Sequence, residues 1–262
     1  MSSGTYLENI LSFHRYRAET DSRSFDQLLS QAQEVEDSKD FISALESPSG
    51  LSVIAEIKRK SPSKGDLNRD LDPGAMAALY ETAGASCISV LTDSEFFAGS
   101  SHDLSSARMS TEIPILRKDF TIDKRDICDA RIMGANCVLL IVSALSDEEL
   151  VSFVALAKEL GIAALVETHD EKEVGRALNA GANLIGVNQR DLYTFEVDQE
   201  RAVRVIREIP NSITTVAESG IRNLEDAIVL ADAGYDAVLI GEAFVKSSNL
   251  SLIHISEPTR PY

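Results

Sequence analysis

Short apolar runs alternate with longer amphipathic segments from residue 51 onward. Runs of this length, rich in β-branched residues and bounded by turn residues, are typical of buried strands. Eight of them occur, at residues 51–57, 86–91, 113–116, 136–142, 162–166, 183–187, 213–217 and 236–240. Strands that alternate with helices pair in parallel, so eight units predict a closed (β/α)8 TIM barrel, an α/β fold. An open doubly wound sheet is the alternative, but the G-x-G-x-x-G turn that it would want after its first strand is missing.

The segments between the runs carry start and stop signals of helices. Residues 147–160 place apolar side chains on one stripe, and Ser146 with Glu149 has the spacing of a capping box. Thr168 and Glu171 repeat this start signal. A glycine before the next strand can adopt the left-handed conformation that closes a helix. Such glycines occur at Gly84, Gly134, Gly181 and Gly234.

The N-terminal part of the chain has a different pattern. Residues 5–46 show helical spacing of apolar residues and precede every predicted strand, and a Ser/Pro/Gly segment follows them. We therefore predict a helical extension over residues 1–50 that packs on a barrel formed by residues 51–250.

Composition places the chain among globular proteins. It has 262 residues, of which 44% are hydrophobic and 26% charged, and no run approaches the length of a membrane span. The N-terminus lacks the basic start and apolar core of a secretory signal, so we expect a cytoplasmic protein. Three cysteines without C-x-x-C spacing and four scattered histidines indicate free thiols and give little support to a metal site.

The net charge of −17 is expected to repel nucleic acid and anionic membranes. Against this background, clusters of cations are informative. One surrounds the end of the first run, at Lys58, Arg59, Lys60 and Lys64, and Arg117 with Lys118 forms a second. Clusters of this kind in an acidic protein indicate a pocket for a small anion, although solvated surface cations would look the same.

Polar or ionisable residues end nearly every predicted strand. In a (β/α)8 barrel, catalytic groups come from the C-terminal ends of the strands and from the loops that follow them. The residues at these ends are Glu56 with Lys58, Thr92-Asp93, Lys118, Ser143, Glu167, Asn188 with Arg190, Glu218-Ser219-Gly220 and Gly241-Glu242. Strand alternation puts Glu56 and Lys58 on one face, where the carboxylate can hold the ammonium.

Two strand ends predict a phosphate site. The seventh and eighth strands end in Ser219-Gly220 and Gly241-Glu242, each with a glycine where a helix should begin. Backbone N–H groups at these loops form the phosphate site that recurs in such barrels.

The remaining groups suit acid–base chemistry on a sugar phosphate. A lysine in a barrel mouth is partly desolvated and near other cations, and both effects lower the pKa of an amine toward the range useful for proton donation. A desolvated Glu167 would have a raised pKa, as a base requires. Asn188 and Arg190 offer an amide and a guanidinium for a carboxylate or hydroxyl.

Seven motifs in this order resemble the indole-3-glycerol-phosphate synthase family, from near the N-terminus to about Ser247. They are Ile54-Ala55-Glu56-Ile57-Lys58-Arg59-Lys60-Ser61-Pro62-Ser63-Lys64-Gly65, Ser89-Val90-Leu91-Thr92-Asp93 with Phe96-Phe97-Ala98-Gly99-Ser100, Leu116-Arg117-Lys118-Asp119-Phe120, Leu165-Val166-Glu167-Thr168-His169, Gly186-Val187-Asn188-Gln189-Arg190-Asp191-Leu192, Ala217-Glu218-Ser219-Gly220-Ile221 and Leu239-Ile240-Gly241-Glu242-Ala243. The resemblance implies a carboxy-lyase of tryptophan biosynthesis that decarboxylates and cyclises 1-(2-carboxyphenylamino)-1-deoxyribulose 5-phosphate. It implies neither a metal nor an organic cofactor.

The resemblance also implies residue roles. Lys118 would protonate the ketone as the ring closes, Glu167 would assist proton removal in the dehydration with Lys58 as its acidic counterpart, and Glu56 would orient the lysines. The substrate would be lined by Ser61, Phe97, Phe120, Asn188, Arg190 and Glu218. Its phosphate would be held by Ser219, Gly220, Gly241 and Glu242. The N-terminal helices would help to cover the mouth of the barrel.

The C-terminal segment departs from the family. The family continues after Lys246 through a last amphipathic helix, whereas residues 251–262 contain two prolines and no helical stripe. We therefore expect an aberrant tail, a missing or replaced final helix, and a complete site on a weakened scaffold. We further expect a monomer or weak homodimer.

Two other functions remain open at this stage. Lys118 could be the Schiff-base lysine of a barrel aldolase, because a desolvated amine suits either role. The chain could also be a non-catalytic barrel that binds a phosphate or supports a partner.

Overall fold

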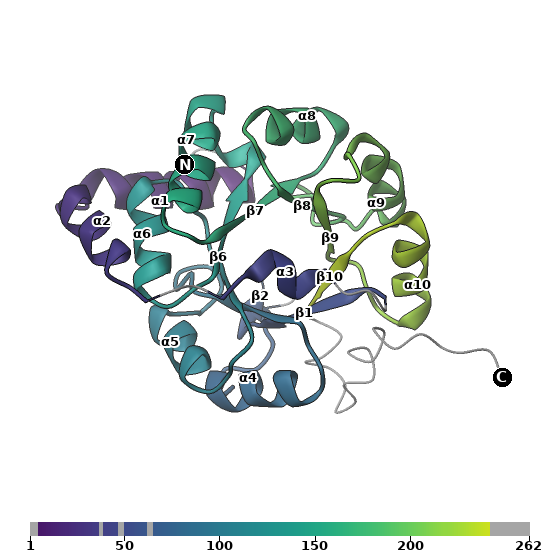
Figure 1. Ribbon diagram of the computed structural model, residues 1–262, viewed down its shortest axis with the longest axis horizontal. Helices are drawn as coiled ribbons and strands as arrows, with labels where there is room; N and C mark the ends of the chain where they lie inside the picture. The colour runs from purple at the N-terminus through teal and green to yellow at the C-terminus, as the bar shows by residue number, and fades with distance from the viewer. Residues whose placement is uncertain (1–4, 37–38, 47–49, 62–64, 242–262) are drawn as a thin grey trace.

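The computed structural model describes residues 5–36, 39–46, 50–61 and 65–241, and it confirms the predicted barrel (Figure 1). Eight parallel strands close on themselves in the order β1-β10-β9-β8-β7-β6-β5-β4. The strands are β1 (Ser52–Ile57), β4 (Cys87–Leu91), β5 (Ile115–Lys118), β6 (Cys137–Ile141), β7 (Ala163–Thr168), β8 (Leu184–Asn188), β9 (Thr214–Glu218) and β10 (Ala237–Ile240). β2 (Lys60–Ser61) and β3 (Gly65–Asp66) form a small antiparallel pair after β1.

One predicted strand is displaced along the chain. The apolar run predicted a strand at residues 113–116, but β5 spans Ile115–Lys118. It begins after Pro114 because proline has no backbone N–H to donate to a ladder. The carbonyl of Pro114 still accepts a hydrogen bond from the Ile88 N–H, at the edge of the β4–β5 ladder. The shift makes Lys118 the last residue of the strand.

Helices connect the strands on the outside of the barrel. They are α4 (Pro73–Thr82), α5 (Ser101–Met109), α6 (Lys124–Ile132), α7 (Asp147–Glu159), α8 (Glu171–Asn179), α9 (Gln199–Val205) and α10 (Leu224–Ala233), with 3-10 turns η1 (Val142–Ala144) and η2 (Ile206–Glu208). The predicted capping box of α7 is present. The predicted start of α8 is wrong, since Asp170 rather than Thr168 is its N-cap. Thr168 ends β7, and its hydroxyl donates to the carbonyl of Gly186 instead. The four predicted stop glycines have positive φ.

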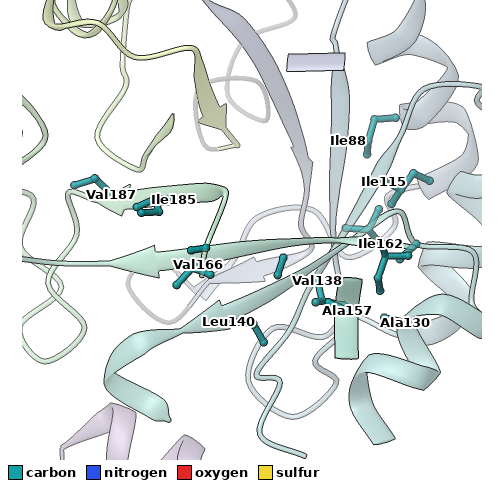
Figure 2. Packing of buried hydrophobic residues seen from close by; sticks show 14 of the residues in the cluster. Ile88, Ile115, Ala130, Val138, Leu140, Ala157, Ile162, Val166, Ile185 and Val187 are labelled. Atoms are coloured by element: carbon teal, nitrogen blue, oxygen red, sulfur yellow. The ribbon is translucent and has the colours of Figure 1, made fainter. Parts of the chain in front are cut away.

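Strand alternation divides the apolar residues into two cores. The outer core lies between the sheet and the helices, and Figure 2 shows strand residues such as Val138 and Val166 in it together with Ala157 of α7. The inner core fills the barrel and includes Leu139 and Leu165. Because successive side chains alternate, Glu167 points inward when Val166 points outward. The last inward residues of the strands therefore meet at one end of the barrel.

The N-terminal helices reach both ends of the barrel. α1 (Tyr6–Thr20) lies at the C-terminal end of the strands, where His14 contacts Asp93 just after β4. α2 (Phe25–Gln33) packs on α6. α3 (Phe41–Leu45) lies near the start of β4, where the Cys87 thiol contacts the Phe41 carbonyl. The implied cover over the mouth is thus supplied by α1, while α3 lies at the opposite end.

Several predictions about the chain as a whole have different outcomes. Cys87, Cys128 and Cys137 are buried free thiols, as predicted. Among the described helices, none is long and apolar enough to cross a membrane. The division at residues 50 and 250 stays a prediction. The expected aberrant tail at 251–262 and the replaced final helix lie outside the described residues.

Candidate active site

Lys118 lies between two buried carboxylates at the C-terminal end of the barrel. Its Nζ is 3.6 Å from Oε2 of Glu167 and 3.9 Å from Oε2 of Glu218. The strand register explains this meeting, because Lys118, Glu167 and Glu218 end or nearly end β5, β7 and β9. The lysine side chain is 17% exposed, whereas the two carboxylates are almost completely buried. The ammonium is therefore the most exposed member of this group.

The electrostatics of Lys118 differ from the prediction. Burial alone would lower the pKa of Lys118, but Glu167, Glu218 and Glu56 outweigh burial and raise it above its usual value. The expected depression was wrong because the lysine is surrounded by carboxylates rather than by other cations. The side chain is held as an ammonium, which is an acid and a hydrogen-bond donor rather than a nucleophile.

Glu167 and Glu218 divide their protons unequally. Burial would raise the pKa of Glu167, but the Lys118 and His169 cations and an Asn188 hydrogen bond lower it. The predicted raised pKa of Glu167 was therefore wrong. Burial and the nearby Glu167 charge instead raise the pKa of Glu218. Two acids this close titrate as a pair, and the pKa of Glu218 lies above that of Glu167.

Glu56 and Lys58 form the ion pair that strand alternation predicts. The Lys58 ammonium contacts Oε1 of Glu56, and both side chains are nearly buried. Glu56 also contributes to the field around Lys118, so it faces both lysines. Gly241 at the end of β10 leaves room for this carboxylate, since a Cβ there would lie 2.4 Å from Oε1 of Glu56.

Two predicted substrate-lining aromatic residues lie together. The rings of Phe97 and Phe120 are 6.4 Å apart, and His14 of α1 is 5.3 Å from the Phe120 ring. The Asp93 carboxylate fixes the loop that carries Phe97, because it accepts hydrogen bonds from the backbone N–H groups of Phe96 and Phe97.

Three other predicted lining residues come from β2, from the end of β8 and from the loop after β8. Ser61 in β2 is buried, and its hydroxyl has no hydrogen-bond partner among the described residues. Asn188 is buried beside Glu167, and its side-chain oxygen Oδ1 accepts a hydrogen bond from the Arg190 backbone N–H. The Arg190 side chain donates to the Phe195 carbonyl. Arg190 is thus held against its own loop.

The predicted phosphate residues lie where β9 and β10 end. Ser219 and Gly220 both have positive φ, 64° and 75°, so the chain turns sharply from β9 toward α10. Asn223 caps that helix, whose N-terminus carries a partial positive charge. Gly241 is buried beside Glu56, and Glu242 lies outside the described residues.

Two of the cations expected to line a pocket for a small anion bind protein groups instead. Arg117 is buried among protein groups and donates to Thr92, Asp119 and the Asp126 carbonyl. It points away from Lys118 because neighbouring strand residues face opposite ways. Arg59 donates to the Asp103 carboxylate. These arginines are structural, Lys60 lies in β2, and Lys64 lies outside the described residues. Lys58 and Lys118 lie at the candidate site.

One group of potential metal ligands occurs among the described residues. His14, Asp93 and Asp119 have ligand atoms within 4.8 Å of one another. These atoms already have protein partners, since His14 pairs with Asp93 at 2.8 Å and Asp119 accepts from Thr92 and Arg117. The group connects α1 to the loops after β4 and β5.

Comparison with known proteins identifies the family. The family model described as "Indole-3-glycerol phosphate synthase" matches residues 7–254. An indole-3-glycerol phosphate synthase from Chloroherpeton thalassium is 46% identical, with 94% of this chain and 97% of the relative covered. Another from a Parafrankia species is 49% identical, with 83% of this chain and 81% of the relative covered.

The chain belongs to the indole-3-glycerol phosphate synthase family. Membership supports the predicted resemblance and the barrel. A solved structure of the N-acetylmannosamine-6-phosphate 2-epimerase from Clostridium perfringens is also similar, with a TM-score of 0.61 and 14% identity. The match covers 78% of this chain and 90% of that structure, and at this identity it supports the fold alone.

Residues beyond those predicted shape the site of this family member. His169 and Glu173 lie behind Glu167, and Gly186 lies against Glu218. His169 and Gly186 lie in motifs that the sequence resemblance already singled out, but their roles depend on neighbouring elements. Gly186 is two residues before Asn188 in the same strand, so strand alternation alone would have placed it on the inward face.

Gly186 provides a test of the carboxylate geometry. A Cβ at this position would lie 2.2 Å from Oε1 of Glu218 and 3.2 Å from the Leu165 side chain. We expect Gly186→Ala to displace Glu218 and to lower kcat/KM by about ten-fold or more, because small misplacements near reacting groups are costly. Overpacking should lower the free energy of unfolding by about 1–3 kcal/mol.

Gly175→Ala is the matched control, to be measured by urea unfolding and steady-state kinetics. Gly175 lies inside α8, and a Cβ there meets nothing within 4 Å. Alanine should stabilise that helix slightly and leave kcat/KM unchanged. Equal kinetics for both variants would show that Glu218 tolerates displacement.

Proposed function

We propose that the chain catalyses the synthesis of indole-3-glycerol phosphate from 1-(2-carboxyphenylamino)-1-deoxyribulose 5-phosphate, with release of carbon dioxide and water. The reaction makes it a carboxy-lyase of tryptophan biosynthesis, as the family implies. The observation that carries the residue assignment is the Lys118 ammonium between the buried Glu167 and Glu218 carboxyl groups.

Lys118 acts first, as the general acid of ring closure. The ring carbon that bears the carboxylate attacks the ketone carbon, and a carbon–carbon bond forms as Lys118 protonates the ketone oxygen. The carboxylate then leaves as carbon dioxide, and its bonding electrons restore the aromatic ring. The raised pKa of Lys118 ensures that the proton is present, and a positioned donor of this kind contributes about 10²–10⁴-fold to a rate.

Dehydration uses Glu167 and Lys58. Glu167 removes the proton from the carbon beside the nitrogen, and Lys58 protonates the departing hydroxyl, which leaves as water. Glu167 lies 3.6 Å from Lys118, so the proton that it gains can restore the Lys118 ammonium. One proton enters from solvent in each cycle, because the carboxylate charge is lost as neutral carbon dioxide.

The remaining predicted residues bind substrate in this proposal. Phe97 and Phe120 flank the carboxyphenyl ring, and Ser61, Asn188, Arg190 and Glu218 line the ring and the hydroxyl groups. The backbone at Ser219, Gly220, Gly241 and Glu242 holds the phosphate, helped by the N-terminus of α10. We also propose a monomer or weak homodimer that works in the cytoplasm.

The fluorescence of the indole product tests the function most simply. Purified protein should generate indole fluorescence from the substrate, and folded protein that gives no product would leave only a binding role. Borohydride added with substrate should give no covalent adduct, since Lys118 is held as an ammonium. An adduct on Lys118 would favour the aldolase alternative.

A further inference from the structure

His169 forms a bridge between Glu167 and the edge of the barrel. It is the first residue after β7, and its Nε2 lies 3.3 Å from Oε1 of Glu167. Its Nδ1 lies 3.0 Å from Oε2 of Glu173 in the first turn of α8. The same glutamate oxygen accepts the His169 backbone N–H at 2.7 Å. Glu173 therefore fixes both the backbone and the ring of His169.

We propose that His169, fixed by Glu173, is a positioning residue that holds the Glu167 carboxylate opposite Lys118, where Glu167 accepts a proton. The proposal rests on the proposed function, in which Glu167 accepts a proton. Oε2 of Glu167 faces Lys118 and Oε1 faces His169, so two cations flank the carboxylate. Glu218 pairs with Lys118 at the longer distance of 3.9 Å, and His169 acts on it from beyond Glu167.

The charge state of His169 follows from the groups around it. The charged groups facing it are Glu167 on β7 and Glu173 on α8, with Glu218 on β9 beyond Glu167. Burial alone would lower the pKa of His169, but the two adjacent carboxylates raise it to about 10. The imidazole is therefore a cation near neutral pH. Its Nδ1 hydrogen-bonds Glu173, whereas its Nε2 lies within ion-pair distance of Glu167 without forming a hydrogen bond to it.

His169→Gln tests this role, because glutamine removes the charge while keeping a side-chain donor. An opposite charge this close shifts a carboxyl pKa by about 1–3 units. We expect the acid limb of the kcat–pH profile and both apparent carboxyl pKa values of the Glu167/Glu218 pair to rise by about one unit. Carbon-13 NMR of labelled glutamate carboxyl groups measures the second quantity without substrate.

Glu173→Gln removes one of the two carboxylates that keep His169 charged. The pKa of His169 should then fall from about 10, as nitrogen-15 NMR of the imidazole measures, while the acid limb of the kcat–pH profile stays in place. Glu171→Gln is the matched control, because Glu171 lies two residues earlier on α8 and pairs with Arg204 at 2.8 Å. It should leave the pKa of His169 and the acid limb unchanged.

The folding equilibrium gives an independent measurement. A raised folded pKa means that the His169 contribution to stability is full below about pH 6.5 and is lost as pH rises through about 10. His169→Gln should remove that slope from the pH dependence of urea unfolding.

Two results would overturn the inference. One is a neutral His169 imidazole near pH 8, observed by nitrogen-15 NMR. The other is an unchanged acid limb and carboxyl titration in a folded His169→Gln variant. If wild-type protein instead makes no product while the NMR titrations behave as expected, the proposed function fails and the electrostatic role of His169 stands.

Discussion

Replacement of Lys118 with methionine is expected to lower kcat by about 10²–10⁴-fold, the range for loss of a positioned general acid. Methionine keeps much of the side-chain volume but has no proton to give to the ketone oxygen. It also leaves Glu167 and Glu218 without their shared cation, so the melting temperature should fall, as when a buried ion pair loses one partner. Indole fluorescence and thermal unfolding measure the two effects.

A second variant separates chemistry from folding. Lys118→Arg keeps a cation between the carboxylates, but a guanidinium does not release its proton at neutral pH. We expect this variant to melt near the wild-type temperature and still to lose about 10²-fold or more in kcat. Lys158→Met, at an exposed position of α7, is the matched control. Near-normal turnover by folded Lys118→Arg would show that Lys118 supplies charge rather than a proton.

Glu167→Gln should also abolish most turnover, again by about 10²–10⁴-fold in kcat. Glutamine has the same shape but cannot accept the proton that dehydration releases. Loss of the charge also removes a cause of the raised Glu218 pKa, so Glu218 should ionise at lower pH. The kcat–pH profile and a carboxyl NMR titration check both expectations.

The reaction step that the Glu167→Gln variant cannot complete identifies the role of Glu167. If Glu167 acts only in dehydration, ring closure and carbon dioxide loss should continue in a single turnover, and the hydroxylated intermediate should accumulate. Glu148→Gln, on an exposed turn of α7, should behave as wild type. Failure to release carbon dioxide in the Glu167 variant would place its action in ring closure and contradict our assignment.

The residues that the sequence predicted best are those set by strand alternation. Glu56 and Lys58 are two residues apart in a strand, so they had to share a face, and they form an ion pair. Strand ends in a closed barrel had to meet, which brought Lys118, Glu167 and Glu218 together. The same alternation separates Arg117 from Lys118, although the sequence analysis grouped them.

Charge states were harder to predict, because they depend on which side chains converge. Desolvation has a known sign for each residue type, but three carboxylates around Lys118 reverse it. His169 was missed as a site residue for the same reason. Its role requires Glu173, whose position depends on α8 beginning after Asp170 rather than Thr168. Because the helix start was predicted wrongly, the contact of His169 with Glu173 was not predicted either.

A single turnover with carboxyl-labelled 1-(2-carboxyphenylamino)-1-deoxyribulose 5-phosphate tests the central claim most directly. With protein in excess, we predict that labelled carbon dioxide and unlabelled indole-3-glycerol phosphate appear in equal amounts, one of each for every substrate molecule consumed. Substrate that stays intact in the presence of folded protein, or a product that keeps the label, would contradict the proposed decarboxylating ring closure.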